Sequence, residues 1–293
     1  MTAPSFPPSV FHSMEALPSE SILRKLYPDD VYPNGEYYTS PNGRVRYWLL
    51  GPPDGDKVVL IHGISVPALA YKNIGPFLAE KGLRVLLYDL HGRGYSEAPK
   101  RVLETSDYAV QLALLLQYVG WDSAKVVGFS MGGGITAAFT SLFPHLVDGK
   151  VVFIASAGLI EIPVGEDGNI RAPNRPKGSA NPNLPALELR NLQGELLPGF
   201  QELLAHDMQY GPITGLDNAF KSLKDIETKG GKLQVLIIHG SQDDIVPVTE
   251  ALKIKERVPQ AEVVQIEDAN HYLVIEDEHW LKVATSIATF LAN

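Results

Sequence analysis

The sequence of 293 residues contains no cysteine, and it contains no Asn-x-Ser/Thr glycosylation signal. Without cysteine, disulfide bonds, thiolate nucleophiles and cysteine-ligated metal or iron–sulfur sites are excluded. A long hydrophobic run is also missing, because the longest apolar stretch, Val151 to Ile160, is far shorter than the roughly 20 residues of a membrane helix. Segment 1–20 has neither the basic start nor the continuous apolar centre of a signal peptide. We therefore expect a cytoplasmic protein.

Basic residues are also fewer than acidic ones: the sequence has 25 Lys and Arg and 34 Asp and Glu, which gives a net charge of −9. An acidic surface repels phosphate backbones and anionic lipid, so we expect neither a nucleic acid nor a membrane as partner. The sequence also lacks a Walker A motif, a complete G-x-G-x-x-G and an H-E-x-x-H. These absences predict a protein without cofactor or metal, whose partner is a small molecule.

What the sequence does contain is a series of short apolar runs rich in β-branched and large aliphatic residues. After an expected hairpin of Tyr37–Thr39 and Val45–Leu49, the runs are Val58–Ile61, Leu83–Tyr88, Lys125–Phe129, Val151–Ala155, Leu233–Ile238 and Glu262–Ile266. Their hydrophobicity is continuous rather than alternating, which predicts strands buried on both faces, as in a parallel sheet.

Helical stretches separate these runs. They are expected at Ile74–Lys81, Thr105–Val119, Met131–Phe143 and His279–Leu291. Strands that alternate with helices predict an α/β fold with a doubly wound, mostly parallel sheet.

The interval from Ile160 to Lys232 breaks this alternation. It is rich in Pro and Asn at first, and helices are expected later, at Glu195–Tyr210 and Leu216–Thr228. A long insert after a strand of such a sheet is typical of a lid over the site. We predict an N-terminal extension at 1–36, an α/β core at 37–159 and 233–293, and a mainly helical cap at 160–232, inserted after the sixth core strand.

The segment Gly128-Phe129-Ser130-Met131-Gly132 carries the strongest chemical signal. It lies between a predicted strand and a predicted helix, the setting in which G-x-S-x-G forms a nucleophile elbow. The glycines leave room for a tight turn that lifts the serine hydroxyl clear of the sheet. The N-terminus of the following helix favours negative charge beside it. We therefore predict that Ser130 is the catalytic nucleophile.

A serine hydroxyl needs a base, and among eight histidines we predict His271, in the loop after the last strand. His62 and His239 each end a strand before a glycine, where a role in positioning the turn is more typical. The base in turn needs a carboxylate. Both Asp243 and Asp244 follow a predicted buried strand, and spacing alone leaves both open. The resulting order along the chain is serine, aspartate and histidine, which is the order expected of hydrolases with a nucleophile elbow.

An oxyanion hole needs two backbone donors that are placed in advance. One is expected to be the N–H of Met131, the residue after the nucleophile. The other is expected to be the N–H of Ile64, in the loop after the first predicted parallel strand. We also expect the neighbouring Ser65, Phe129 and Tyr272 to contact the substrate.

Five segments resemble the α/β-hydrolase superfamily, and they occur in the family's order over about residues 37–293. They are HG at His62, DLHGRGYS at Asp89–Ser96, GFSMGG at Gly128–Gly133, HGSQDDIVP at His239–Pro247 and NH at Asn270-His271. In this family the acid is usually the aspartate three residues after the glycine, so the resemblance implies Asp243 rather than Asp244. It also implies that Asp89 and Arg93 are structural.

Related subfamilies differ from this chain at informative positions. Haloalkane dehalogenases and epoxide hydrolases carry aspartate at the elbow, where this chain has Ser130. Meta-cleavage product hydrolases, which cleave carbon–carbon bonds, share the SMGG elbow and an asparagine like Asn73. They usually carry a tryptophan soon after the catalytic histidine, where this chain has Tyr272.

The resemblance therefore implies a capped serine hydrolase that cleaves a small-to-medium carboxylic ester or lactone through an acyl-enzyme. Three alternatives remain open on the sequence. They are a carbon–carbon bond hydrolase of the meta-cleavage product type, a cofactor-free perhydrolase, and a small-molecule receptor on a hydrolase fold.

Overall fold

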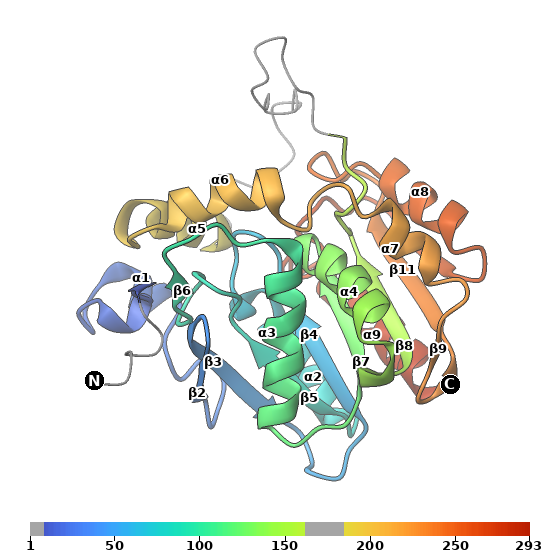
Figure 1. Cartoon of the computed structure of the whole chain (residues 1–293), viewed down its shortest axis with the longest axis horizontal. Coiled ribbons are helices and arrows are strands. Elements are labelled where there is room, and N and C mark those ends of the chain that lie inside the picture. Colours follow the sequence, from blue (N-terminus) through green and yellow to red (C-terminus); the bar gives the residue numbers. More distant parts are fainter. Residues whose placement is uncertain (1–8, 162–184) are drawn as a thin grey trace, which may run out of the picture.

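The computed structural model describes residues 9–161 and 185–293, which build one central sheet covered by helices (Figure 1). The sheet strands are β2 (Glu36–Ser40), β3 (Gly43–Leu50), β4 (Lys57–Ile61), β5 (Arg84–Tyr88), β7 (Ala124–Phe129), β8 (Val147–Ile154), β11 (Gln234–Gly240) and β12 (Glu262–Ile266). Their spatial order is β12-β11-β8-β7-β4-β5-β3-β2. Strand β3 runs antiparallel to β2 and β5, and the remaining neighbours are parallel. The predicted mostly parallel α/β sheet is confirmed.

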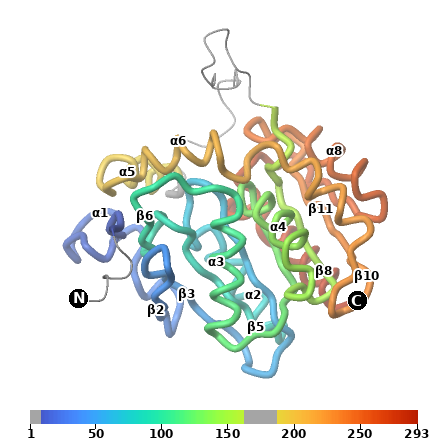
Figure 2. Tube along the Cα trace, viewed as in Figure 1, coloured from blue at the N-terminus to red at the C-terminus, as the bar shows by residue number. Residues whose placement is uncertain are grey.

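Helices lie on both faces of the sheet and over one end of it (Figures 1 and 2). They are α1 (Ile22–Leu26), α2 (Ile74–Glu80), α3 (Thr105–Tyr118), α4 (Met131–Leu142), α5 (Pro185–Leu196), α6 (Phe200–Tyr210), α7 (Asp217–Ser222), α8 (Thr249–Arg257) and α9 (Trp280–Ala292). Short 3₁₀ helices occur at Met14–Ala16, Ala68–Tyr71 and Pro144–Leu146. Two small antiparallel pairs join β1 (Val10–Phe11) to β6 (Ala98–Pro99) and β9 (Glu227–Thr228) to β10 (Gly231–Lys232).

The continuous hydrophobicity of the central strands reflects two separate cores. In β4, Val58 and Leu60 belong to the core that α2 and α9 cover, whereas Val59 and Ile61 belong to the core under α3 and α4. All four side chains are fully buried. Burying an aliphatic side chain of this size contributes about 1.5–3 kcal/mol, so each direction of the strand requires an apolar residue.

Strand β12 departs from the expectation of a buried run. Of its five residues only Ile266 is buried, and the other four are exposed or half-buried. The reason is its place at the edge of the sheet, where it pairs with β11 alone. An edge strand needs fewer apolar residues, which agrees with the polar Glu262 and Gln265 in its sequence.

The helices of the predicted cap also differ in detail from the expectation. The single helix predicted at Glu195–Tyr210 is divided between α5 and α6, because Gly199 adopts a positive φ of 81° at the start of α6. The helix predicted at Leu216–Thr228 ends at Ser222, and its last residues form β9. Helix α8 was not predicted.

The N-terminal extension packs against both core and cap. The Tyr27 hydroxyl donates to the Asp89 carboxylate at 3.0 Å, and the Tyr32 hydroxyl donates to the Ala68 carbonyl at 2.9 Å. Helix α1 packs on the cap helix α5. The division at 1–36, 37–159 with 233–293, and 160–232 stays a prediction, since residues 1–8 and 162–184 lie outside the described residues.

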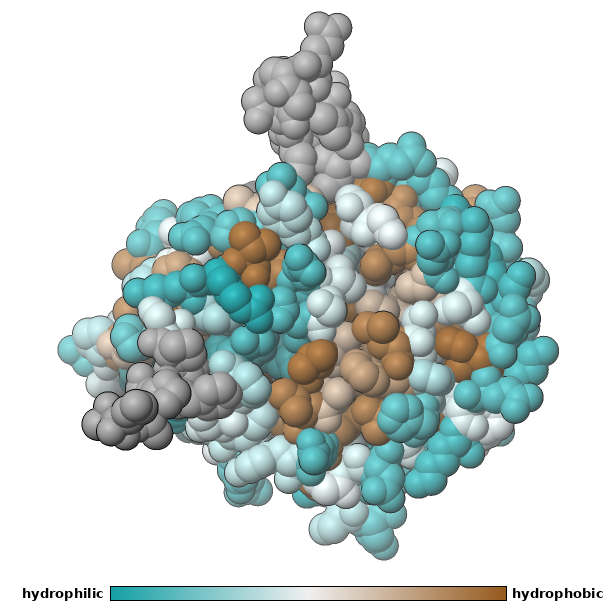
Figure 3. Space-filling model, in the orientation of Figure 1, coloured by the Kyte–Doolittle hydropathy of each residue, from teal (hydrophilic) through white to brown (hydrophobic). Residues whose placement is uncertain are grey.

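The surface adds two observations. Among the described helices, none has the length and apolar character needed to cross a membrane. On the face in Figure 3, hydrophobic residues gather near the middle, where Figure 1 shows α3 and α4. These two helices expose Val110, Tyr118 and Leu142.

Candidate active site

Ser130 lies on a strained turn between β7 and α4, with φ 55° and ψ −119°. Such a conformation is costly for a residue with a side chain, and it persists only where the surroundings enforce it. The two flanking glycines make the turn possible. A Cβ at Gly128 would overlap the Gly132 carbonyl, and a Cβ at Gly132 would overlap the Ile61 carbonyl. The turn therefore forces the serine out of the strand direction at the end of the sheet.

The structure brings the predicted serine, histidine and aspartate into one chain of hydrogen bonds. His271 Nε2 lies 3.0 Å from Ser130 Oγ, and His271 Nδ1 lies 2.8 Å from Asp243 Oδ2. Ser130, His271 and Asp243 are 7%, 5% and 7% exposed, so the chain is shielded from bulk water but reachable at the serine. Of the two candidate acids, Asp243 contacts His271 and Asp244 does not.

Asp243 is fixed by several donors. Its Oδ1 accepts hydrogen bonds from the Ile245 and Val246 amides at 3.0 and 2.8 Å. His239 Nε2 lies 3.4 Å from Oδ2 and 2.8 Å from the Val246 carbonyl. Burial raises the pKa of Asp243, but the charge and hydrogen bond of His271 and the hydrogen bond of His239 outweigh burial and lower that pKa below its ordinary value. The carboxylate therefore stays charged. From the sequence, His239 was expected only to position the turn, and its contact with Asp243 was not predicted.

His62 holds the loop that follows β4. Its Nε2 accepts a hydrogen bond from the Leu90 amide at 2.9 Å, so Nδ1 carries the proton and donates to the Gly63 carbonyl at 2.7 Å. Burial lowers the pKa of His62 to about 3, so the ring stays neutral. Both ring nitrogens of His62 are engaged, so His62 does not serve as the base. It instead fixes the peptide between Gly63 and Ile64, which carries the Ile64 N–H.

The two expected oxyanion donors flank the serine. A Cβ built on Gly63 would lie 3.2 Å from the Ser130 Cβ, so the loop with Ile64 passes directly beside the nucleophile. Met131 is the first residue of α4, and its N–H therefore has no acceptor within the helix. Both residues therefore lie next to Ser130, and their N–H groups stay the predicted donors of an oxyanion hole.

A cavity of about 390 Å³ opens onto Ser130 and His271. The described residues that line it are Gly63, Ile64, Ser65, Val66, Phe129, Ser130, Arg190, Leu204, Met208, Ile245, His271 and Tyr272. The expected contact residues Ser65, Phe129 and Tyr272 are therefore all in its wall. Phe129 also packs on the His271 ring, with centroids 5.1 Å apart.

The residues that α5 and α6 of the predicted cap contribute to the cavity could not be identified from the sequence. Arg190 comes from α5, and Leu204 and Met208 come from α6. These residues share no motif with the core, and no sequence signal distinguishes them from other amphipathic helix positions. The resulting wall is mainly apolar, and Arg190 is the one residue with a permanent charge among the described lining residues.

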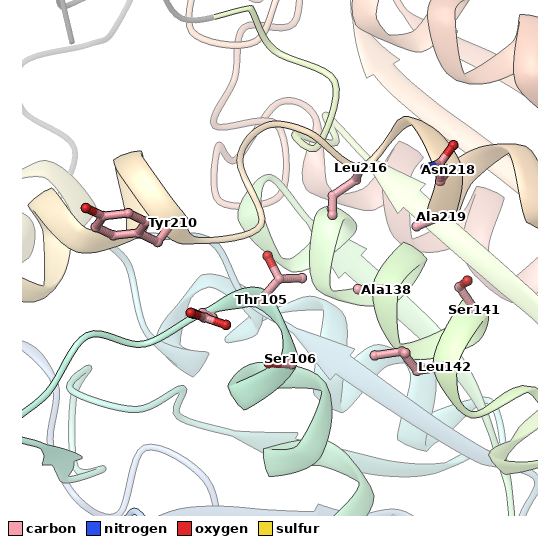
Figure 4. A pocket seen from close by; sticks show the side chains of 10 residues that line it. Thr105, Ser106, Ala138, Ser141, Leu142, Tyr210, Leu216, Asn218 and Ala219 are labelled. Carbon is pink, nitrogen blue, oxygen red and sulfur yellow. The ribbon is translucent and has the colours of Figure 1, made fainter. Parts of the chain in front are cut away.

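A second hollow of about 480 Å³ lies on the outer surface between α3, α4 and α7 (Figure 4). Figure 4 shows the hydroxyl side chains of Thr105 and Ser141 with Leu142 and Leu216, and Ser106 also lines the hollow. The described residues that line it include no histidine, so it lacks the base that nucleophilic catalysis by a hydroxyl requires. Within the described residues, no group of three or more histidines, cysteines or carboxylates is arranged to hold a metal ion.

Comparison with known proteins adds a family and several relatives. A family model described as alpha/beta hydrolase fold matches residues 56–278. The chain is 29% identical over 259 residues to 2-hydroxymuconate semialdehyde hydrolase of Pseudomonas sp. (strain CF600), a match that covers 82% of this chain and 88% of that protein.

A second relative is the dihydrolipoyllysine-residue acetyltransferase component of the acetoin cleaving system of Pseudomonas putida, 27% identical over 254 residues. That match covers 80% of this chain, and this chain spans 64% of the length of that protein. Among solved structures, the meta-cleavage product hydrolase from Pseudomonas fluorescens IP01 is similar, with a TM-score of 0.67, 22% identity, and coverage of 88% of this chain and 98% of that one. At this identity the likeness concerns the fold alone.

Proposed function

The chain belongs to the α/β-hydrolase family, and from that premise we propose that it is a serine hydrolase that works through a covalent acyl-enzyme on Ser130. One observation carries the proposal. The Ser130 hydroxyl, the His271 imidazole and the buried Asp243 carboxylate form a continuous hydrogen-bonded chain at 3.0 and 2.8 Å. Nucleophile, base and orienting acid in this geometry are what activation of a serine hydroxyl requires.

The first half of the reaction follows from these contacts. Asp243 accepts a hydrogen bond from the Nδ1–H of His271, which leaves Nε2 free to take the Ser130 proton as Oγ attacks the substrate carbonyl. The negative charge that develops on the carbonyl oxygen is held by the N–H groups of Ile64 and Met131. Collapse of this intermediate breaks the bond to the leaving group, which takes the proton from His271 and departs as an alcohol.

The second half uses the same groups with water in place of the serine. His271 takes a proton from water, and the hydroxide attacks the acyl carbon that Ser130 carries. When the intermediate collapses, the bond to Oγ breaks, Ser130 recovers its proton from His271 and a carboxylic acid leaves. The loops and cap around the site keep bulk water away while the intermediate forms.

The substrate we propose is a small-to-medium carboxylic ester or lactone. The cavity of about 390 Å³ falls in the range that small-molecule sites occupy. Its wall holds the apolar side chains of Val66, Leu204, Met208 and Ile245, which suit an aliphatic or aromatic acyl group. A polymer does not fit a cavity of this size.

A second candidate is hydrolysis of a carbon–carbon bond next to a ketone in a substrate that also carries a carboxylate. Arg190 in the cavity wall supplies the positive charge that such a carboxylate would pair with. A relative named 2-hydroxymuconate semialdehyde hydrolase points the same way. Tyr272, where these hydrolases usually carry tryptophan, counts against it. The same triad serves both reactions, so the bond cleaved depends on the substrate that fits.

The deciding experiment compares three substrates on the same enzyme. These are p-nitrophenyl butyrate, a γ-lactone and a 2-hydroxy-6-oxo-dienoate, each with Ser130→Ala as the blank. We expect kcat/KM for the ester or lactone to exceed that for the dienoate by at least about tenfold. The reverse ratio would assign the chain to carbon–carbon hydrolysis. Tight binding of a small molecule with no turnover of any substrate would favour a receptor and contradict the proposal.

A further inference from the structure

Three consecutive carbonyl groups of the loop beside Ser130 are each held by a buried side chain. His62 Nδ1 donates to the Gly63 carbonyl at 2.7 Å, as described above. Arg93 Nε donates to the Ile64 carbonyl at 2.9 Å. Gln193 Nε2 donates to the Ser65 carbonyl at 2.8 Å. The peptide that carries the Ile64 N–H is thereby fixed on both sides.

Arg93 is held in turn by the cap. Its side chain is fully buried, and its second guanidinium nitrogen forms an ion pair with Asp207 of α6, which is also fully buried. The Tyr108 hydroxyl donates to the other oxygen of the same carboxylate at 2.6 Å. The remaining nitrogen of the guanidinium donates to the His91 carbonyl at 3.1 Å. Because the guanidinium is planar and rigid, Asp207 and this carbonyl together fix where the Nε of Arg93 points.

Gln193 makes a similar connection from the other cap helix. Its amide is fully buried in α5 and bridges two loops of the core. While Nε2 donates to the Ser65 carbonyl, Oε1 accepts from the Gly94 amide at 3.1 Å. Two of the three contacts that fix the loop therefore come from the cap or depend on it.

We propose that Asp207 and Gln193 are positioning residues that make the oxyanion hole depend on the docked cap. Asp207 acts through Arg93 on the Ile64 carbonyl, and Gln193 acts directly on the Ser65 carbonyl. The inference rests on the proposed function, because it takes the Ile64 N–H to be an oxyanion donor. It gives the cap a part in the rate of reaction in addition to its part in lining the cavity.

The size of the effect follows from what an oxyanion donor contributes. Loss of one donor costs about 10²–10³ in kcat, and a donor that is displaced rather than lost costs part of this. We therefore expect about tenfold lower kcat when either cap contact is removed. Binding of the uncharged ground state hardly uses the donor, so KM should change by less than about threefold.

The test uses the full chain and four variants. Asp207→Asn weakens the ion pair without changing the shape of the side chain, and Gln193→Met removes the amide without leaving a buried charge. Arg93→Lys keeps the positive charge but cannot reach Asp207 and the Ile64 carbonyl together. Ser222→Ala is the matched control, because it removes a hydrogen bond between α7 and Ser141 of α4 and none from the Arg93 network or the loop.

Two readouts separate positioning from general damage. The first is kcat and KM on the best ester. The second is the Kd of a trifluoromethyl ketone, whose adduct with Ser130 places an oxyanion beside Ile64. In the first three variants we expect kcat to fall about tenfold and the Kd of the ketone to rise by the same factor. Inhibition by the carboxylic acid product should stay unchanged, and Ser222→Ala should match the wild type within about twofold.

The outcomes are distinct. If Gln193→Met, which is expected to fold, keeps wild-type kcat and ketone affinity, the cap does not position the loop and the inference is wrong. It is equally wrong if kcat falls in Ser222→Ala as far as in Asp207→Asn. If the wild type neither reacts with a fluorophosphonate at Ser130 nor hydrolyses an ester, the proposed function fails instead. If it does both, only the role of the cap is in question.

Discussion

The triad and the contacts between cap and loop are both buried polar systems, but the chain holds them in different ways. Ser130, Asp243 and His271 each stand on a loop that directly follows a strand of the parallel sheet. Because β7, β8, β11 and β12 are parallel, these loops lie at the same end of the sheet. Asp207 and Gln193 stand on cap helices, and they reach core loops about a hundred residues earlier in the chain through single side chains.

The two systems should therefore respond differently when one of their side chains is replaced. The triad is placed by a backbone that many hydrophobic contacts stabilise, so replacing one of its side chains should alter chemistry and leave the fold intact. Helices α5 and α6 are held against the core in part by a few buried polar contacts. Replacing one of these should affect stability and the geometry of the neighbouring loop together.

The sharpest contrast within the core is expected between two adjacent aspartates. Asp243→Asn should lower kcat by about 10⁴, because an amide cannot hold the imidazole in the required tautomer. Asp244→Asn should stay within about twofold, since Asp244 makes no contact with His271. Steady-state kinetics on one ester measures both. Equal losses would show that the wrong carboxylate has been assigned.

The largest effect on stability is expected in the cap. Asp207→Ala leaves the buried guanidinium of Arg93 without its partner, which typically costs about 3–5 kcal/mol in the free energy of unfolding. The matched control is Asp217→Ala in α7, whose ion pairs with Lys221 and Arg257 are partly exposed. This change should cost far less than Asp207→Ala, because solvent screens the exposed pairs. Urea denaturation compares the two, and similar costs would mean that the buried pair does not hold the cap.

A smaller effect is expected for the charge in the cavity wall. Arg190→Gln removes the permanent charge that a substrate carboxylate could pair with. A charged hydrogen bond contributes about 1.5–3 kcal/mol, so kcat/KM for a carboxylate-bearing ester should fall roughly 10- to 100-fold. The uncharged ester of the same length serves as the control and should be nearly unaffected. A loss of the same size on both esters would mean that Arg190 acts on the fold of the cavity.

The smallest effect concerns the pH dependence of stability. Burial raises the pKa of Asp243, yet His271 and His239 outweigh it and the pKa is lowered in the folded state. A lowered pKa stabilises the fold above the unfolded value of about 4, and this contribution is lost as the pH falls through the folded pKa. The difference in unfolding free energy between wild type and Asp243→Asn should therefore be larger by about 1–2 kcal/mol at neutral pH than near pH 3. A constant difference would contradict the lowered pKa.

The sequence carried enough information for the sheet and for the residues at its strand ends. Strand runs such as Val58–Ile61 are continuous because both directions of the strand meet a core, and that pattern is local in sequence. The elbow around Ser130 is also local, because its glycines are required by backbone contacts within the motif and with the neighbouring strand. Features that depend on residues close together in the sequence, such as these strands and the elbow, could therefore be predicted.

The cap could not be predicted in the same way. Nothing near Gln193 in the sequence indicates that its amide bridges Ser65 and Gly94. The resemblance marked Arg93 as structural but gave no sign of Asp207, its partner more than a hundred residues later. His239 was missed as a neighbour of Asp243, because its position before a glycine indicates only a turn. Such contacts depend on how the cap docks and on side-chain directions, which no local pattern encodes.

The central claim is that the Ser130 hydroxyl is activated by His271. Intact-protein and peptide mass spectrometry after reaction with a fluorophosphonate tests it most directly. We predict a single adduct on Ser130 in the wild type, and none in Ser130→Ala, whose free energy of unfolding should match the wild type within about 1 kcal/mol. An unlabelled wild type, or an adduct that persists on another residue of a folded Ser130→Ala, would contradict the account.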